Sequence, residues 1–186
     1  YLSPDAIQEK IAHVSKPEEY PDGELFGKAA VNVPNYGLKN FADLFTNRQL
    51  TALTTFSNLV AKVQQKAMQD ALSAGLSNDE TPLAEGGAGA LAYGQAVGVY
   101  LTFVIDRQAS YSSTINTWGG DFIVQTFGRQ AIPMIWDYAE TNIFSHSSGC
   151  FDNMLEWVIK SILTLPTNGK CVANQNDAQT DCGLRN

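Results

Sequence analysis

The residues best suited to chemistry gather in one stretch, residues 127–151. The stretch mixes aromatic rings, both signs of charge, amide groups, hydroxyls and a histidine. A segment this rich in rings and hydrogen-bonding groups either pins helices together or lines a site, and the sequence leaves both interpretations open. The residues expected to contact a substrate or a neighbouring domain are Arg129, Trp136, Asp137, Glu140, Asn142, His146 and Ser148.

His146 is followed directly by Ser147 and Ser148, which suggests a serine nucleophile beside a histidine base. The members of such a triad rarely adjoin in sequence, and the chain contains no G-x-S-x-G elbow. A turn that precedes the next helix is the favoured interpretation. We therefore assign no catalytic residue, and a small hydrolase is the third-ranked function.

Asp137 and Glu140 stand three residues apart and would share one face of a helix. Paired carboxylates can act as general acid and base when a pocket holds them together. Arg129 lies close in the sequence, so an internal salt bridge to Arg129 is the favoured use of these carboxylates.

Neither a metal site nor a phosphate loop is predicted. Cys150, Cys171 and Cys182, with His146, lack the paired C-x-x-C spacing of zinc sites. The glycine-rich run at 86–89 lacks the Lys-Ser/Thr pair of a P-loop and follows no strand, so a hinge or a close helix contact is favoured there.

The composition indicates one globular domain. The chain has 186 residues, 44% of them hydrophobic, with a net charge of −7 and a pI near 4.7. This acidity argues against independent binding of phosphate backbones. The odd cysteine count and the absence of a leader-like start predict a cytoplasmic protein. The most apolar stretch, 88–105, contains Gln95 and is interpreted as a buried helix, so no membrane association is expected.

The hydrophobic periodicity predicts a mainly α fold: a single helical domain with at most a short strand or two near the C-terminus. Thr46 and Gln49 form a capping box that starts an amphipathic helix ending at Gly75. A second helix, 88–109, carries small residues that permit close packing, and a last helix covers 151–165. Shorter helices are predicted from Ser3 to Val14, within 36–45 and after Pro133 to Glu140, with a strand at 171–173. Residues 1–35 are interpreted as an extended connector with a short helix, and 36–186 as the helical domain.

Three segments of the chain, 36–60, 85–107 and 126–151, resemble the middle part of a family of large prokaryotic proteins described as adenine-specific DNA methyltransferases with an uncharacterised amino-terminal domain. The likeness covers nearly the whole chain and is strongest over 36–177. It implies that this chain is a helical insertion of an α/β methyltransferase, between the two halves of its site. The family's glycine motif and its catalytic Asp-Pro-Pro-Tyr motif are both absent from the 186 residues.

The resemblance implies S-adenosylmethionine as the cofactor of the parent protein and DNA as its substrate, reached by flipping out the target adenine. By position, Asp177 matches an acidic residue that faces the cofactor adenine in such folds; a solvated tail aspartate is the alternative. The expected partners are the rest of the methyltransferase chain, DNA through that parent protein, and a second copy of the fragment. We expect the chain alone to be inactive and to bind little cofactor.

The competing hypothesis is a non-catalytic helical interaction module. It predicts an exposed apolar groove beside the glycine-rich helix, near Gly94 and Gly98. A hydrolase would instead require a carboxylate within hydrogen-bond reach of His146.

Overall fold

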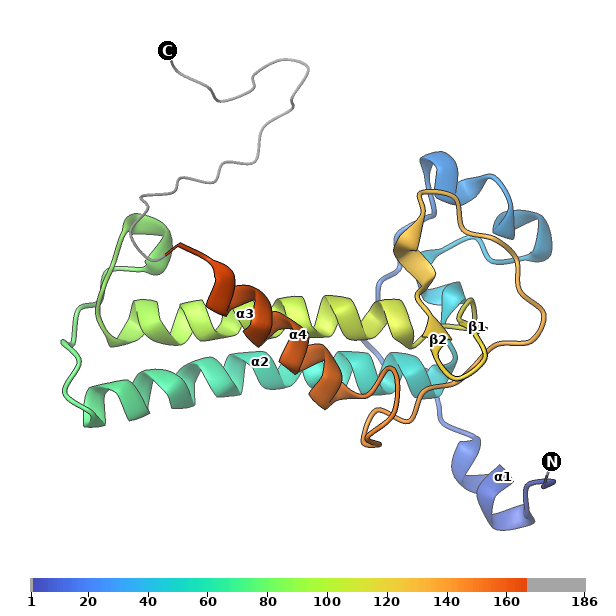
Figure 1. The fold of residues 1–186 in the computed structure, drawn as a ribbon, viewed down its shortest axis with the longest axis horizontal. Helices are drawn as coiled ribbons and strands as arrows, with labels where there is room; N and C mark the ends of the chain where they lie inside the picture. The colour runs from blue at the N-terminus through green and yellow to red at the C-terminus, as the bar shows by residue number, and fades with distance from the viewer. Residues whose placement is uncertain (1, 167–186) are drawn as a thin grey trace.

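The computed structural model describes residues 2–166, and within them the chain is mainly helical, as predicted. Two long helices lie antiparallel, and a shorter helix crosses one of them (Figure 1). The segments before the first long helix and after the second gather at one end of this pair, and the connection between the two helices lies at the other end. Asp177 and the strand predicted at 171–173 lie outside the described residues.

Helix α2 (Asn47–Ser73) confirms the predicted start and stop signals. The Thr46 hydroxyl accepts a hydrogen bond from the backbone N–H of Gln49, and the Gln49 side-chain oxygen accepts one from the backbone N–H of Thr46. At the other end Gly75 adopts a φ of 95°, and Leu76 N–H donates to the Ala71 carbonyl at 3.0 Å. This is a Schellman ending, which satisfies carbonyls that the helix leaves free.

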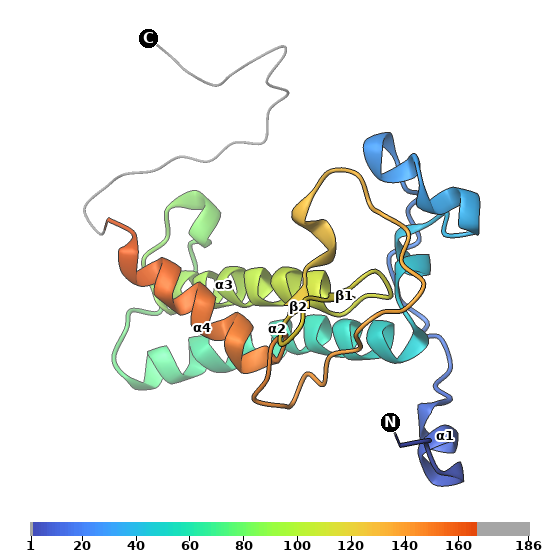
Figure 2. The ribbon, with the colours of Figure 1, turned by 45° about the vertical axis from the view of Figure 1, so that its right-hand side comes forward.

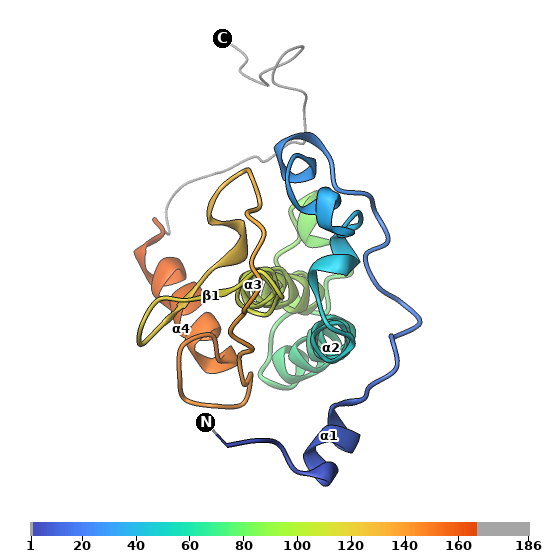
Figure 3. The same ribbon diagram turned by 90° about the vertical axis from the view of Figure 1, so that its right-hand side faces the viewer.

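Helix α3 (Ala90–Tyr111) runs back along α2, and the two are seen end on in Figure 3. Its glycines permit the close approach that the sequence predicted. A Cβ added to Gly94 would lie 2.6 Å from the backbone oxygen of Gln64, and one added to Gly98 would lie 1.9 Å from the Gln64 Nε2. Backbone atoms of α2 beside Gly94, and the Gln64 side chain beside Gly98, therefore occupy the space that larger α3 side chains would need.

Helix α4 (Phe151–Thr164) packs across α3 and buries Met154 (Figure 2). The predicted boundaries of this helix are confirmed to within a residue. Cys150 is also buried at its start, so the thiol behaves as a small apolar group in the core.

A second cluster of apolar residues lies among the connections. Its buried members are Leu25, Val33, Leu44, Ile115 and Ile132. Short 3₁₀ turns supply much of its backbone: η1 (Gly27–Ala30), η2 (Val33–Tyr36), η3 (Phe41–Leu44) and η5 (Thr126–Gly128), with η4 (Leu83–Glu85) before α3. The chain before residue 36 thus contributes to a core from Leu25 onward.

The described sheet is a hairpin in the middle of the chain. Strands β1 (Thr117–Trp118) and β2 (Ile123–Val124) pair antiparallel, with Thr117 opposite Val124. Asn116 holds this hairpin on the end of α3, because its amide donates to the carbonyls of Ser110 and Val124, each at 2.9 Å. Its side-chain oxygen accepts from Ser113 N–H at 2.6 Å.

Some short elements differ from prediction. Helix α1 (Ala6–Ala12) is capped by Asp5 and not by Ser3, because Asp5 and Gln8 form a capping box. The region 36–45 forms 3₁₀ turns and no α-helix.

The helix predicted after Pro133 was wrong: residues 132–140 are irregular. Ile132 is drawn into the second cluster, and Ala139 N–H donates to the Asn116 carbonyl at 2.9 Å. These tertiary contacts outweigh local helix propensity.

Candidate functional site

The residues predicted to form a site in 127–151 do not converge. Arg129 and Asp137 are exposed, and neither forms an ion pair with a described residue. Arg129 lines an open cavity of about 310 Å³ together with Thr126, Pro133 and Ile135. The polar side chains of this loop therefore do not meet at a common point.

Glu140 pairs with Arg48 at 2.6 Å, and the predicted bridge to Arg129 was wrong. The guanidinium makes two bonds to this carboxylate and a third, of 2.9 Å, to the carbonyl of Ala12. The Glu140 hydrogen bond and charge raise the pKa of Arg48. Burial, with the Glu140 charge, raises the pKa of the Tyr138 hydroxyl. This arrangement links three segments that are distant in the sequence, around residues 12, 48 and 140, and indicates a structural role for the ion pair.

His146 is exposed, and within the described chain it makes no ion pair with a carboxylate. Ser148 instead accepts a 3.3 Å bond from Ile123 N–H, which joins this loop to β2. The Asn142 carboxamide accepts from Phe144 N–H at 3.1 Å and closes a local turn. Cys150 N–H donates to the Ser147 carbonyl at 3.2 Å, so the turn predicted at 147–149 is present.

Trp136 is 79% exposed. Its ring packs edge-on against Tyr36, with ring centroids 5.4 Å apart. The indole therefore packs against one aromatic ring and meets solvent over most of its surface.

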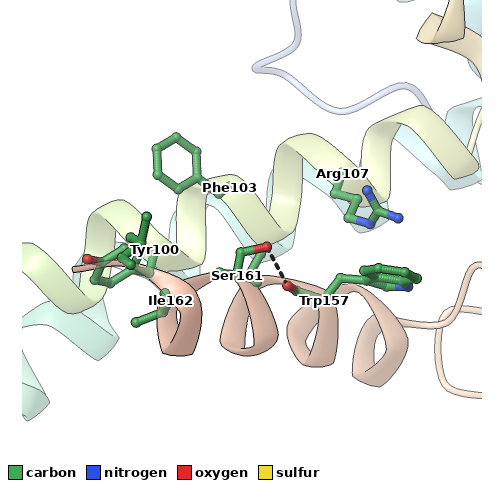
Figure 4. A pocket seen from close by; sticks show the side chains of 8 residues that line it. Tyr100, Phe103, Arg107, Trp157, Ser161 and Ile162 are labelled. Carbon is green, nitrogen blue, oxygen red and sulfur yellow. Dashed lines mark hydrogen bonds between the residues drawn. The ribbon is translucent and has the colours of Figure 1, made fainter.

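Sequence reasoning missed a groove between α3 and α4, which we call the α3–α4 groove. Its volume is about 280 Å³. The side chains that line it are Tyr100, Phe103, Arg107, Trp157, Val158, Ser161, Ile162 and Leu165. Figure 4 shows the aromatic and aliphatic side chains along one length of the groove and Arg107 above Trp157 at the other end.

Arg107 is held by aromatic faces. Its guanidinium carbon lies 5.2 Å from the centroid of the Trp157 ring and 5.7 Å from that of Tyr111. Such cation–π contacts fix the guanidinium plane without consuming its hydrogen-bond donors. The Ser161 hydroxyl, by contrast, donates to the Trp157 carbonyl and is already satisfied.

The groove is surrounded by exposed apolar side chains. Phe103 is 53% exposed, Trp157 54% and Leu165 55%. One sequence signal pointed here: Trp157 places a bulky aromatic group outside the predicted apolar face of α4.

A further apolar hollow of about 240 Å³ lies where α2, α3 and α4 meet. Phe56 and Phe151 stack there at a centroid distance of 4.7 Å. Phe56 also lines a neighbouring hollow with Phe144. These hollows offer no described charged donor except Arg48, which Glu140 engages.

The described residues include no group of three or more metal-ligating side chains and no helix able to cross a membrane. The α3–α4 groove is thus the feature that best combines volume, exposed rings and a charged group. No family model matches the chain, and neither curated proteins nor solved structures gave a match.

Proposed function

We propose that this chain is an internal helical segment of an S-adenosylmethionine-dependent adenine-specific DNA methyltransferase, and that it docks on the rest of that enzyme through the α3–α4 groove. One observation carries the docking role: bulky apolar side chains from two helices are exposed together around a groove. The enzyme class rests on the resemblance of segments 36–60, 85–107 and 126–151.

The energetic argument concerns Phe103, Trp157 and Leu165, each slightly more than half exposed. Fully burying a large apolar side chain stabilises by about 1.5–3 kcal/mol relative to leaving it in water. Three such groups, half buried already, therefore leave about 3 kcal/mol to be gained on contact with another surface. Contiguous apolar surface of this kind marks interaction sites.

In this proposal the segment is inactive alone and positions other parts of the enzyme. S-adenosylmethionine and DNA bind to the parent protein, where the catalytic Asp-Pro-Pro-Tyr motif of the family would act. The net charge of −7 supports packing against protein in preference to broad phosphate contact. The proposed location of the enzyme is the cytoplasm, and its proposed substrate is the DNA there.

The test is calorimetric titration of S-adenosylmethionine into residues 1–186 and into the complete product of the encoding gene, with methyl transfer to adenine in DNA assayed in parallel. We expect cofactor binding and methyl transfer only in the complete protein. Phe103→Ser should reduce the transfer, while Phe144→Ser, an exposed aromatic outside the groove, should leave it unchanged. Binding of the cofactor to residues 1–186 alone would contradict the proposal that the cofactor site lies in the rest of the enzyme.

A non-catalytic interaction module is the second candidate, and the same groove favours it. The two candidates differ in cofactor use: a module would bind S-adenosylmethionine in neither form of the protein. The groove lies beside the glycine-rich helix, as that hypothesis predicted. Gly94 and Gly98 themselves, however, face α2 and are buried.

A further inference from the structure

Arg107 is a cation in the α3–α4 groove whose charge is not matched by any described carboxylate. It appears in none of the ion pairs of residues 2–166, and its Nε is buried without a hydrogen-bond partner among them. The rings of Trp157 and Tyr111 hold the guanidinium in place. Its terminal nitrogens therefore stand ready to donate from a fixed position, a geometry suited to a planar anion.

The other charges near the groove do not neutralise Arg107. Lys160 lies 5.8 Å from the centroid of the Trp157 ring, but its ammonium pairs with Glu156 at 2.7 Å. Asp106 precedes Arg107 in α3 and is exposed without an ion pair to any described residue. Arg107 thus adds an uncompensated positive charge to the face of a chain whose net charge is −7.

The remainder of the groove is apolar. Leu165 is among its lining residues; Tyr100 and Ile162 lie at the end away from Arg107, and Phe103 projects from α3 between Tyr100 and Arg107 (Figure 4). A ligand that fits both ends must carry an apolar body with one negative group at its end. A volume of about 280 Å³ is at the lower end of small-ligand pockets and suits a few side chains.

We propose that the polypeptide segment docking on this groove is apolar and places one acidic side chain, Asp or Glu, on the Arg107 guanidinium. This inference rests on the proposed function, because it names the chemistry of the docking partner. Arginine and carboxylate form paired hydrogen bonds with strict geometry, so the contact fixes the register of the segment along the groove. The apolar side chains supply area, and the carboxylate selects which segment binds.

A DNA phosphate is the less favoured anion for this position. Proteins that bind a phosphate backbone use several cations along a surface. Within the described groove Arg107 stands beside rings and aliphatic groups, and Lys160 is already paired. The acidic chain would also repel an extended polyanion.

The first experiment uses two small probes, 3-phenylpropionate and its uncharged amide, titrated into ¹⁵N-labelled residues 1–186. The resonances to follow are the Arg107 Nε–H and the Trp157 indole N–H. We expect the carboxylate to shift both resonances saturably and to bind about fivefold more tightly than the amide, since only the anion receives charge-assisted bonds.

The controls are three variants that keep the fold, verified by their spectra. Arg107→Gln should abolish the preference for the carboxylate. Arg107→Lys should retain part of it, because lysine keeps the charge but loses the planar fork. Arg129→Gln, an exposed arginine elsewhere, should match the wild type. Equal binding of acid and amide, or an equal loss in Arg129→Gln, would refute the contact.

A short DNA duplex added at low salt completes the test. Saturable shifts of the same two resonances that Arg107→Gln removes would assign the site to phosphate and overturn the inference. The two proposals also fail separately. Methyl transfer that depends on Phe103 without any acid preference would refute only the carboxylate contact. An acid preference with methyl transfer insensitive to Phe103→Ser would refute the docking role.

Discussion

The two sides of helix α3 are built from opposite kinds of residue. The side toward α2 carries Gly94 and Gly98, which lie against Gln64 with no room for a Cβ. The side toward α4 carries Tyr100, Phe103 and Arg107, and leaves a groove of about 280 Å³. Helix α3 thus packs closely against α2 through small residues and leaves large residues exposed on the side toward α4. We call these the closed side and the open side of α3. Under the proposed docking role, the side toward α4 is the surface that another polypeptide segment covers, and the side toward α2 needs no further partner.

The largest expected effect is on the closed side. Gly94→Val should lower the free energy of unfolding by about 3 kcal/mol, because its Cβ meets the α2 backbone, which cannot rotate away. Gly98→Val should cost less, since it meets the flexible Gln64 side chain. Urea unfolding followed by circular dichroism measures both. Thr102→Val, the same new residue on the exposed side of α3, is the control; equal losses at positions 94 and 102 would break the comparison.

Gln108 tests a second buried contact of α3, with the loop that precedes α4. Its amide donates to the Gly149 carbonyl and to the Ser112 hydroxyl, each at 2.8 Å, and the residue is 1% exposed. Gln108→Met keeps the side-chain length but removes both bonds, so we expect a loss of about 2 kcal/mol in unfolding free energy. Gln130→Met, at an exposed position, should change it by less than about 0.5 kcal/mol. A neutral Gln108→Met would show that the amide bonds add nothing.

The open side should respond differently. Phe103→Ser is expected to change the unfolding free energy of residues 1–186 by less than about 1 kcal/mol, because half of the ring already meets solvent. The same variant should weaken docking in the complete protein. The informative pattern is a large functional effect with a small effect on stability, measured on one set of preparations. A loss of stability as large as that of Gly94→Val would place Phe103 in the core and contradict the account.

The smallest effect is expected from Glu140, which lies on neither side of α3. Its pair with Arg48 is partly exposed and therefore weakly stabilising. Glu140→Gln should cost about 0.5 kcal/mol in urea unfolding, and Arg129→Gln should cost nothing measurable. A larger loss in Arg129→Gln than in Glu140→Gln would support the salt bridge to Arg129 that was first predicted from the sequence.

The long elements were predictable because their signals are local. The capping pair Thr46 and Gln49, the period of apolar residues in α2 and the glycine at position 75 all lie within the helix or directly beside it. The small residues of α3 likewise announced a tight contact. The mainly helical fold and the ends of α2 and α4 follow from such signals.

The candidate site was harder to predict from the sequence, because its contacts join distant parts of the chain. Arg48 and Glu140 are 92 positions apart in the sequence. The salt bridge was predicted with Arg129 only because Arg129 is closer to Glu140 in the sequence. The helix expected at 132–140 gave way to contacts with Asn116 and the second cluster. The α3–α4 groove exists only once α4 is laid across α3, so Arg107 and Trp157 carried no joint signal in the sequence.

The most direct test of the central claim is the solvent accessibility of Trp157 in the isolated chain and in the complete protein. Trp118→Phe with Trp136→Phe leaves Trp157 as the only tryptophan of residues 1–186, and the other tryptophans of the complete protein would be replaced likewise. Acrylamide quenching of its fluorescence should be strong in residues 1–186 and several-fold weaker in the complete protein, because the docked segment covers the groove. Equal quenching in both would show that the groove stays open and would contradict the account.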